Sequence, residues 1–154
     1  AERNGPYSRI ESNMSDQKWY QGSLRFSCTQ CGNCCTGAPG YVWVSREEIR
    51  RIAEFLKKDE EWLGKDHLRR VGFKYSLTER ANGDCVFLTT DSNGHRGCGI
   101  YPVRPLQCRT WPFWSRNLKS PAHWRQAGEN CPGMNNGREY DFERIEQIRL
   151  QKSW

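Results

Sequence analysis

The sequence has no long hydrophobic run. Its apolar stretches, such as Tyr41 to Val44 and Val86 to Leu88, are far shorter than the ~20 residues that a membrane-spanning helix needs. Residues 1–10 contain no apolar stretch resembling a signal peptide. We therefore expect no membrane association and a cytoplasmic location.

Common catalytic motifs are missing as well. The chain has no glycine-rich phosphate loop, no His-Glu-x-x-His pair and no Ser/His/Asp order, so nothing indicates a hydrolase or a nucleotide-binding protein. The three histidines, His67, His95 and His123, lack the spacing of a ligand pair. His95 is the best placed of them to bind a metal, because it lies just before Cys98.

The basic charge of the chain is not concentrated in any segment. It has 24 Lys and Arg against 18 Asp and Glu, a formal net charge of +6, and the two signs are interspersed. Thiolates at a metal site would reduce this positive charge further. Nucleic-acid binding is therefore disfavoured.

Residues 1–25 are polar and rich in Gly, Ser and Asn. We expect them to form an arm that is anchored through Trp19 and Tyr20. Residues 26–154 should form one cysteine-cluster metal-binding domain, since a chain of this length can bury a modest core.

The pattern in the first part of this domain predicts a strand followed by two helices. Tyr41–Val44 has the composition of a short strand, and Ser45 with Glu48 forms a capping box that starts a helix. This helix should end near Lys58. A second helix is predicted from about Glu60 to Val71.

The later segments predict a hairpin and two more helical stretches. Residues 73–79 and 85–89 flank Asn82-Gly83, a pair that favours a tight turn between antiparallel strands. A short helix is predicted over Pro102–Arg109, and Asp141 can cap a C-terminal helix. The expected fold is a small single α+β domain with irregular metal-pinned loops, a short antiparallel hairpin and about three helices.

Cysteine is concentrated in the segment Cys28-Thr-Gln-Cys31-Gly-Asn-Cys34-Cys35. A Cys-x2-Cys turn directs two sulfurs toward one centre and leaves backbone N–H groups free to bond to the thiolates. Gly32 relieves crowding where the backbone curls. The addition of Cys34 gives the three-ligand spacing of bacterial ferredoxins, whose run continues to a later Cys-Pro.

The remaining cysteines are further candidate ligands. Cys131-Pro132 can supply the fourth ligand, whereas Cys35 is expected to serve another centre because adjacent side chains diverge. One partition places Cys28, Cys31, Cys34 and Cys131 on one centre and Cys35, Cys85, Cys98 and Cys108 on the other. The spacing alone does not fix this partition.

Other interpretations of the eight cysteines stay open. An iron–sulfur cluster, of the 4Fe-4S type, is favoured over zinc because two structural zinc sites would be expected to show two Cys-x2-Cys pairs. Disulfides are an alternative, but 8 cysteines in 154 residues are about 5%, below the roughly 8–10% of disulfide scaffolds. Each cysteine outside the motif could also be an ordinary buried residue.

The segment around Cys108 offers residues that could surround a metal site. Arg104 and Arg109 could offset thiolate charge through N–H contacts to sulfur. Trp111, Phe113 and Trp114 could keep water away from the centre, although core packing is their more ordinary role.

The chain resembles the YkgJ-type cysteine-cluster family, whose domain is described as zinc- or iron-chelating. The resemblance covers about residues 26–131 and rests on the four-cysteine motif, the strand and capped helix after it, and the block Cys98-Gly-Ile-Tyr101-x2-Arg104-Pro105-x2-Cys108-Arg109. It implies that the chain binds zinc or iron. A similar cysteine run accompanies flagellin lysine methylases, but this chain has no recognisable site for a methyl donor.

We therefore expect a metal-binding protein with an iron–sulfur cluster, used in electron transfer with a redox protein partner or in an auxiliary redox role. A zinc-bound structural or interaction module without catalysis is the alternative. A metal-dependent protein-modifying enzyme is a third hypothesis.

Overall fold

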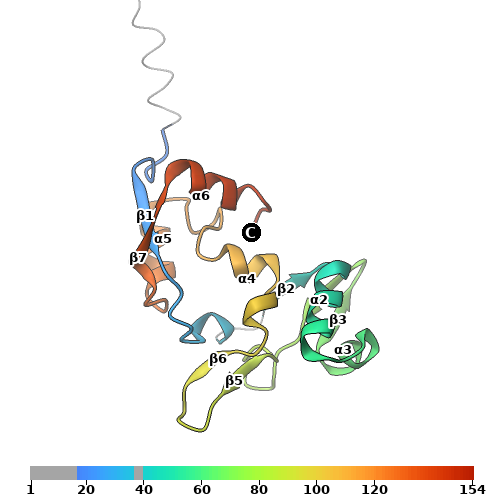
Figure 1. Ribbon diagram of the computed structural model, residues 1–154. Helices are drawn as coiled ribbons and strands as arrows, with labels where there is room; N and C mark the ends of the chain where they lie inside the picture. The colour runs from blue at the N-terminus through green and yellow to red at the C-terminus, as the bar shows by residue number, and fades with distance from the viewer. Residues whose placement is uncertain (1–16, 37–39) are drawn as a thin grey trace, which may run out of the picture.

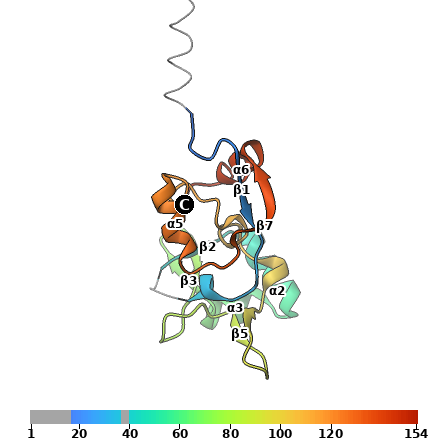
Figure 2. The same cartoon turned by 90° about the vertical axis from the view of Figure 1, so that its left-hand side faces the viewer.

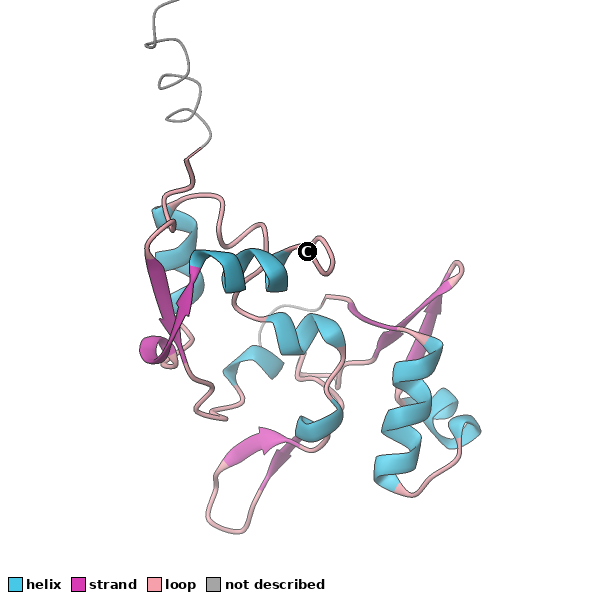
Figure 3. Ribbon diagram, turned by 45° about the horizontal axis from the view of Figure 1, so that its top comes forward, coloured by secondary structure: helices cyan, strands magenta, loops and turns pink. Residues whose placement is uncertain are grey.

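The computed structural model describes residues 17–36 and 40–154. These residues form a mixed α+β domain with two separate hydrophobic cores and a cysteine-bearing region between them (Figure 1). Its helices and strands are short, and they are joined by long loops (Figure 3). The predicted fold class is confirmed.

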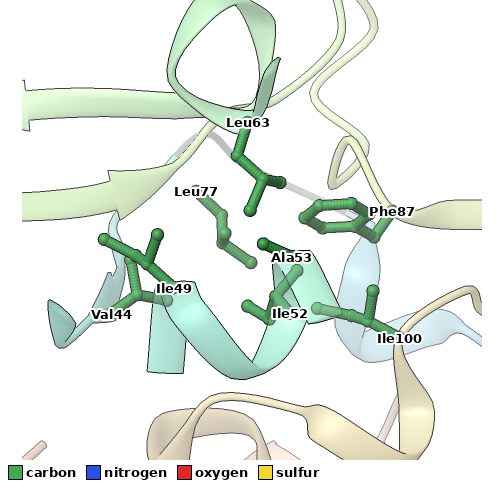
Figure 4. Close-up of a cluster of buried hydrophobic side chains, with 8 residues drawn as sticks. All are labelled: Val44, Ile49, Ile52, Ala53, Leu63, Leu77, Phe87 and Ile100. Carbon is green, nitrogen blue, oxygen red and sulfur yellow. The ribbon is translucent and has the colours of Figure 1, made fainter. Parts of the chain in front are cut away.

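The first core lies beneath a three-stranded antiparallel sheet. Its strands are β2 (Val42–Val44), β4 (Lys74–Leu77) and β3 (Leu68–Val71), in the order β2-β4-β3. Helices α2 (Arg46–Leu56) and α3 (Glu60–Asp66) complete it. The buried side chains shown in Figure 4 are Val44, Ile49, Ile52, Ala53, Leu63, Leu77, Phe87 and Ile100.

The capped helix follows the sequence pattern closely. The Ser45 hydroxyl accepts from the backbone N–H of Glu48 at 3.1 Å, and the Glu48 carboxylate accepts from the N–H of Ser45 at 3.0 Å. The helix ends at Leu56, and the residue after it, Lys57, has the left-handed conformation. The predicted strand and the predicted first helix are therefore confirmed.

The second core is built from segments at the two ends of the described chain. Strand β1 (Ser23–Phe26) pairs antiparallel with β7 (Met134–Asp141), and α5 (Pro121–Gly128) and α6 (Phe142–Arg149) lie beside them (Figures 1 and 2). The core residues are Tyr20, Phe113, Leu118, Trp124, Met134 and Ile145. Asp141 caps α6 as predicted, because its side chain accepts from the N–H of Arg144.

The cysteine-bearing region lies between the two cores. It contains the 3-10 turns η1 (Asn33–Cys35) and η2 (Tyr101–Val103) and the helix α4 (Leu106–Thr110). Strands β5 (Leu88–Thr90) and β6 (Arg96–Cys98) form a hairpin that projects from it at the bottom of Figure 1.

Several predicted elements differ from the structure. The hairpin predicted for residues 73–79 and 85–89 is reduced to a bridge between Glu79 and Cys85, because β4 instead pairs on both sides with β2 and β3. The second predicted helix ends at Asp66, and the residues up to Val71 form β3. The predicted helix at 102–109 is divided into η2 and α4.

The described residues also contain more helices than the expected three or so, namely α2 to α6. Helix α5 was not predicted, although Ser120 caps it and Pro121 opens it. Within the predicted polar arm, residues 1–16 lie outside the described residues. Tyr20 is 2% exposed in the second core, and β1, which begins at Ser23, pairs with β7, so the end of the predicted arm is attached to the domain at these points. None of the helices in the described ranges has the length and apolar character to cross a membrane.

Candidate metal centre

The cysteine loop, residues 28–35, presents sulfurs that accept backbone hydrogen bonds. The N–H of Gln30 donates to Cys28 Sγ at 3.4 Å, and the N–H of Asn33 donates to Cys31 Sγ at 3.4 Å. Positive φ angles of 55° at Gln30 and 77° at Gly32 turn the backbone to make these contacts. Such N–H contacts stabilise thiolates at metal sites.

Cys35 lies at the centre of a group of thiols. Its thiol is within hydrogen-bonding reach of the sulfurs of Cys34, Cys85 and Cys98. Cys85 comes close because its backbone N–H donates to the Cys35 carbonyl oxygen at 2.7 Å. Cys98 comes close because it pairs with Leu88 across the β5–β6 hairpin. Leu88 lies only three residues after Cys85.

These contacts shift the thiol pKa values in opposite directions. Hydrogen bonding to the Cys35 thiol lowers the pKa of Cys34 to about 6 and that of Cys85 to about 7, and it lowers the pKa of Cys98 as well. The same contacts, led by that with Cys34, raise the pKa of Cys35. Lowered pKa values favour the thiolate, which is the metal-binding form.

Cys108 lies on α4 beside the same group. Burial raises the pKa of its thiol, and the nearby thiolates of Cys34, Cys85 and Cys98 raise it further. We call the five residues together the Cys35 group: Cys34, Cys35, Cys85, Cys98 and Cys108.

The two arginines near α4 have different positions. Arg104 is close enough for its positive charge to lower the pKa values of Cys34, Cys98 and Cys108, and its guanidinium lies 3.8 Å from the centroid of the Tyr101 ring. Arg109 is exposed, and its Nε donates to the carbonyl oxygen of Arg104 at 3.0 Å. Arg109 therefore supports the backbone of Arg104, and no contact between its side chain and sulfur is found among the described residues.

Cys131 belongs to the opposite side of the site. It packs against the second core, and the indole N–H of Trp111 donates to its sulfur at 3.5 Å. Its loop contacts the cysteine loop through Asn130, whose carbonyl oxygen accepts from Asn33 Nδ2 at 3.1 Å. The N–H of Ser27 also donates to the carbonyl oxygen of Gly133 at 3.1 Å.

The structure thus brings together most of the predicted ligands but does not assign them to centres. It brings Cys35, Cys85, Cys98 and Cys108 together, which are the second set in the one partition considered from the sequence, and Cys34 lies beside them. Cys28 contacts this region through a hydrogen bond with the Tyr101 hydroxyl. The partition of ligands stays a prediction.

The donor set fits a metal in the type of its side chains. All eight cysteines lie in the described ranges and are free thiols. Within those ranges, however, no three Cys, His, Asp or Glu side chains converge as one bound ion would require. The gathered thiols contact one another instead, so metal binding must be accompanied by reorientation of their side chains.

A groove opens onto two of the cysteines. It has a volume of about 690 Å³, and its lining includes Gln30, Cys31, His95, Arg96 and Cys98. His95 is exposed, and its Nδ1 lies 3.4 Å from a carboxylate oxygen of Asp91. His67 stacks between Trp62 and Phe87, and His123 contacts the hydroxyl of Ser120. The groove gives solvent and other molecules a route to Cys31 and Cys98.

Three contact residues were not identified from the sequence. The Tyr101 hydroxyl forms a hydrogen bond with Cys28. Burial, together with this hydrogen bond, raises the pKa of Tyr101. Asn33 and Arg96 contact each other through Asn33 Oδ1 and Arg96 Nη2 at 2.5 Å. Asn33 lies inside the motif, but its partners are distant in sequence, so no local pattern could have identified the contact.

The fold and the site together define a small α+β domain organised around cysteine-bearing loops. A family model described as "CxxCxxCC: Putative zinc- or iron-chelating domain" matches residues 27–132, and the chain belongs to this family. Uncharacterized protein MJ0661 of Methanocaldococcus jannaschii is 31% identical over 94 residues, which are 61% of this chain and 48% of that relative. The chain therefore spans about half the length of this relative. No solved structure matches the chain.

Proposed function

We propose that this protein holds an iron–sulfur cluster at the Cys35 group and exchanges electrons with a protein partner. The observation that carries this proposal is the number of thiols gathered there. Cys35 and its neighbours supply five thiols, which is enough for the four cysteine ligands of a 4Fe-4S cluster. A cluster of this kind supplies reversible one-electron transfer when it is bound.

Cys35, Cys85, Cys98 and Cys108 would hold the cluster, and Cys34 is close enough to replace one of them. Arg104 would offset the negative charge of the thiolates, as its effect on the pKa values of Cys34 and Cys98 indicates. The second core, which includes Phe113, would limit the access of water from its side. A redox partner in the cytoplasm would approach through the groove at Cys31 and Cys98.

A zinc-bound structural module is the second candidate function. The observation that favours it is the pair of N–H···S contacts to Cys28 and Cys31. A Cys-x2-Cys turn of this kind supplies two ligands to a four-coordinate zinc ion. Cys34 and Cys131 would be the other two ligands, in keeping with the partition predicted from the spacing.

The deciding experiment measures iron, zinc and acid-labile sulfide in protein that is purified without oxygen and without added metal. Iron with matching sulfide and broad absorption near ~400 nm would support the cluster. Reversible reduction and reoxidation of that absorption would support electron transfer. Stoichiometric zinc without sulfide would replace this proposal with the structural module, and protein without either metal would contradict both.

A further inference from the structure

Asn33 lies between Cys31 and Cys34 and makes two long-range side-chain contacts. Its Nδ2 donates to the carbonyl oxygen of Asn130 at 3.1 Å, and its Oδ1 accepts from Arg96 Nη2 at 2.5 Å. Asn130 immediately precedes Cys131, and Arg96 is two residues before Cys98. One amide therefore contacts both of the segments that bring these distant cysteines to the cysteine loop.

The backbone around Asn33 holds this amide in place. Its own N–H donates to Cys31 Sγ, and its carbonyl oxygen accepts from the N–H of Thr36 at 3.1 Å and from the Thr36 hydroxyl at 2.8 Å. Gly32, with φ of 77°, gives the turn its direction. The side chain of Asn33 is therefore presented from a turn that is fixed on both sides.

The segment that carries Cys131 is held from two sides, in addition to the contact of the Cys131 sulfur with Trp111. On one side, Asn130 is bound by the Asn33 amide. On the other, the carbonyl oxygen of Gly133 accepts from the N–H of Ser27, and a side chain at Gly133 would clash with the Ser27 carbonyl. The contact with Asn33 is the one that originates inside the cysteine loop.

We propose that Asn33 is a positioning residue that keeps Cys131 beside the cysteine loop, so that metal bound there joins the second core to the rest of the domain. This inference rests on the second candidate function, in which zinc is held by Cys131 together with Cys28, Cys31 and Cys34. Asn33 acts through the two segments that it contacts and does not itself bind the metal. Loss of its amide should release the Cys131 segment and leave Cys35 and Cys85 in contact through the backbone.

The test is site-resolved alkylation of the full, zinc-loaded chain with iodoacetamide, read by peptide mass spectrometry. In Asn33→Ala, Cys131 should react roughly tenfold faster than in the wild type, since partners that orient metal ligands typically contribute that much to metal affinity. Cys85 should keep its wild-type rate. The thermal midpoint of each variant shows whether the chain remains folded.

Two further variants make the test specific. Asn136→Ala is the matched control, because the Asn136 amide donates to the carbonyl oxygens of Pro132 and Met134, each at 3.1 Å, in the same loop. It should leave the rate at Cys131 unchanged. Asn33→Asp keeps an acceptor for Arg96 but loses the donor to Asn130, so Cys131 should react faster in this variant as well.

The outcomes separate this inference from the function on which it rests. If the wild type binds zinc but Cys131 reacts at the wild-type rate in folded Asn33→Ala and Asn33→Asp, the role of Asn33 alone is overturned. Equal acceleration in Asn136→Ala would also overturn it, because any loosening of the loop would then suffice. Wild type that binds no zinc would overturn the second candidate function and this inference together.

Discussion

The backbone N–H of Cys85 donates a 2.7 Å hydrogen bond to the carbonyl oxygen of Cys35. This bond joins the loop before β5 directly to the adjacent Cys34-Cys35 pair. The two segments therefore meet through the main chain as well as through their sulfurs. A substitution of either thiol should leave the main-chain contact in place, so such variants report on the sulfur itself.

Cys35→Ser should remove most of the bound metal. Cys35 is within reach of three other thiols, and a serine hydroxyl stays protonated where a metal needs a thiolate. We expect metal affinity to fall by roughly tenfold or more, measured by competition with a chromophoric chelator. The matched control is Thr36→Ser, which keeps the hydroxyl that donates to the Asn33 carbonyl. A full metal complement in Cys35→Ser would remove Cys35 from the ligand set.

Gly32→Ala should destabilise the protein more than Gly94→Ala. Both glycines have positive φ angles, 77° and 82°, and an alanine in that conformation costs about 1–2 kcal/mol. At Gly32 the added Cβ would also lie 2.9 Å from Leu88 Cδ1 and 3.2 Å from Arg96 Cβ, whereas at Gly94 nothing lies within 4 Å. Overpacking adds about 1–3 kcal/mol.

Urea unfolding of the two metal-loaded variants measures this difference. Gly32→Ala should also lose metal faster, because Leu88 and Arg96 belong to the hairpin that carries Cys98. Equal free energies of unfolding for the two variants would show that the hairpin moves aside without cost, and that its packing on Gly32 does not position the cysteines.

Local sequence signals predicted the helices that Ser45 and Asp141 cap, although α5, which Ser120 caps, was not predicted. Ser45 with Glu48 and Asp141 each satisfy backbone N–H groups within one turn, so the relevant contacts lie close together in the sequence. The Asn82-Gly83 pair gave the wrong hairpin. The preceding strand β4 pairs with β2, which is distant in sequence, and with β3, the other arm of a tight hairpin. The turn at residues 80–84 therefore closes only the bridge between Glu79 and Cys85.

The candidate site was predictable in residue type but not in arrangement. The spacing of Cys28, Cys31 and Cys34 identified the motif, and the family match supports metal binding. The position of Cys34 beside Cys35, Cys85 and Cys98 depends on how η1 packs against the β5–β6 hairpin. No sequence spacing encodes that packing.

Glu146→Gln should flatten the acid side of the stability profile. Hydrogen bonds from Arg149, at 2.6 and 2.8 Å, lower the pKa of Glu146 below its ordinary value, and the Tyr20 hydroxyl also donates to it. The unfolded chain, with an ordinary Glu pKa of about 4.3, therefore binds this proton first as the pH falls. The stabilisation is present above that pKa and is lost as the pH falls through the lower folded value.

Chemical denaturation of wild type and Glu146→Gln between about pH 3 and pH 6 measures this effect. The wild type should lose its advantage over the variant as the pH falls from about 5. Release of metal by acid affects both proteins, so the difference between them isolates Glu146. A constant difference across this range would show that the ion pair with Arg149 does not contribute to acid sensitivity.

Removal of metal should lower the thermal midpoint of the wild type. The candidate ligands come from segments that contact both cores: Cys85 and Cys98 pack against the first, and Cys131 packs against the second. Because the thiols do not converge on one point in their present arrangement, bound metal should supply part of the folding free energy. A loss of about 3 kcal/mol corresponds to a decrease of roughly 6–12 °C for a chain of this size.

Calorimetry before and after treatment with a strong chelator, without oxygen, measures this decrease. Cys35→Ser is the control, since a variant that holds little metal should change little when the chelator is added. Returning the native metal to the treated wild type should restore its midpoint, because ligand binding to the folded state stabilises it by mass action. If the wild-type midpoint stays the same after complete removal, the two cores are stable without the centre, and metal has no structural role in joining them.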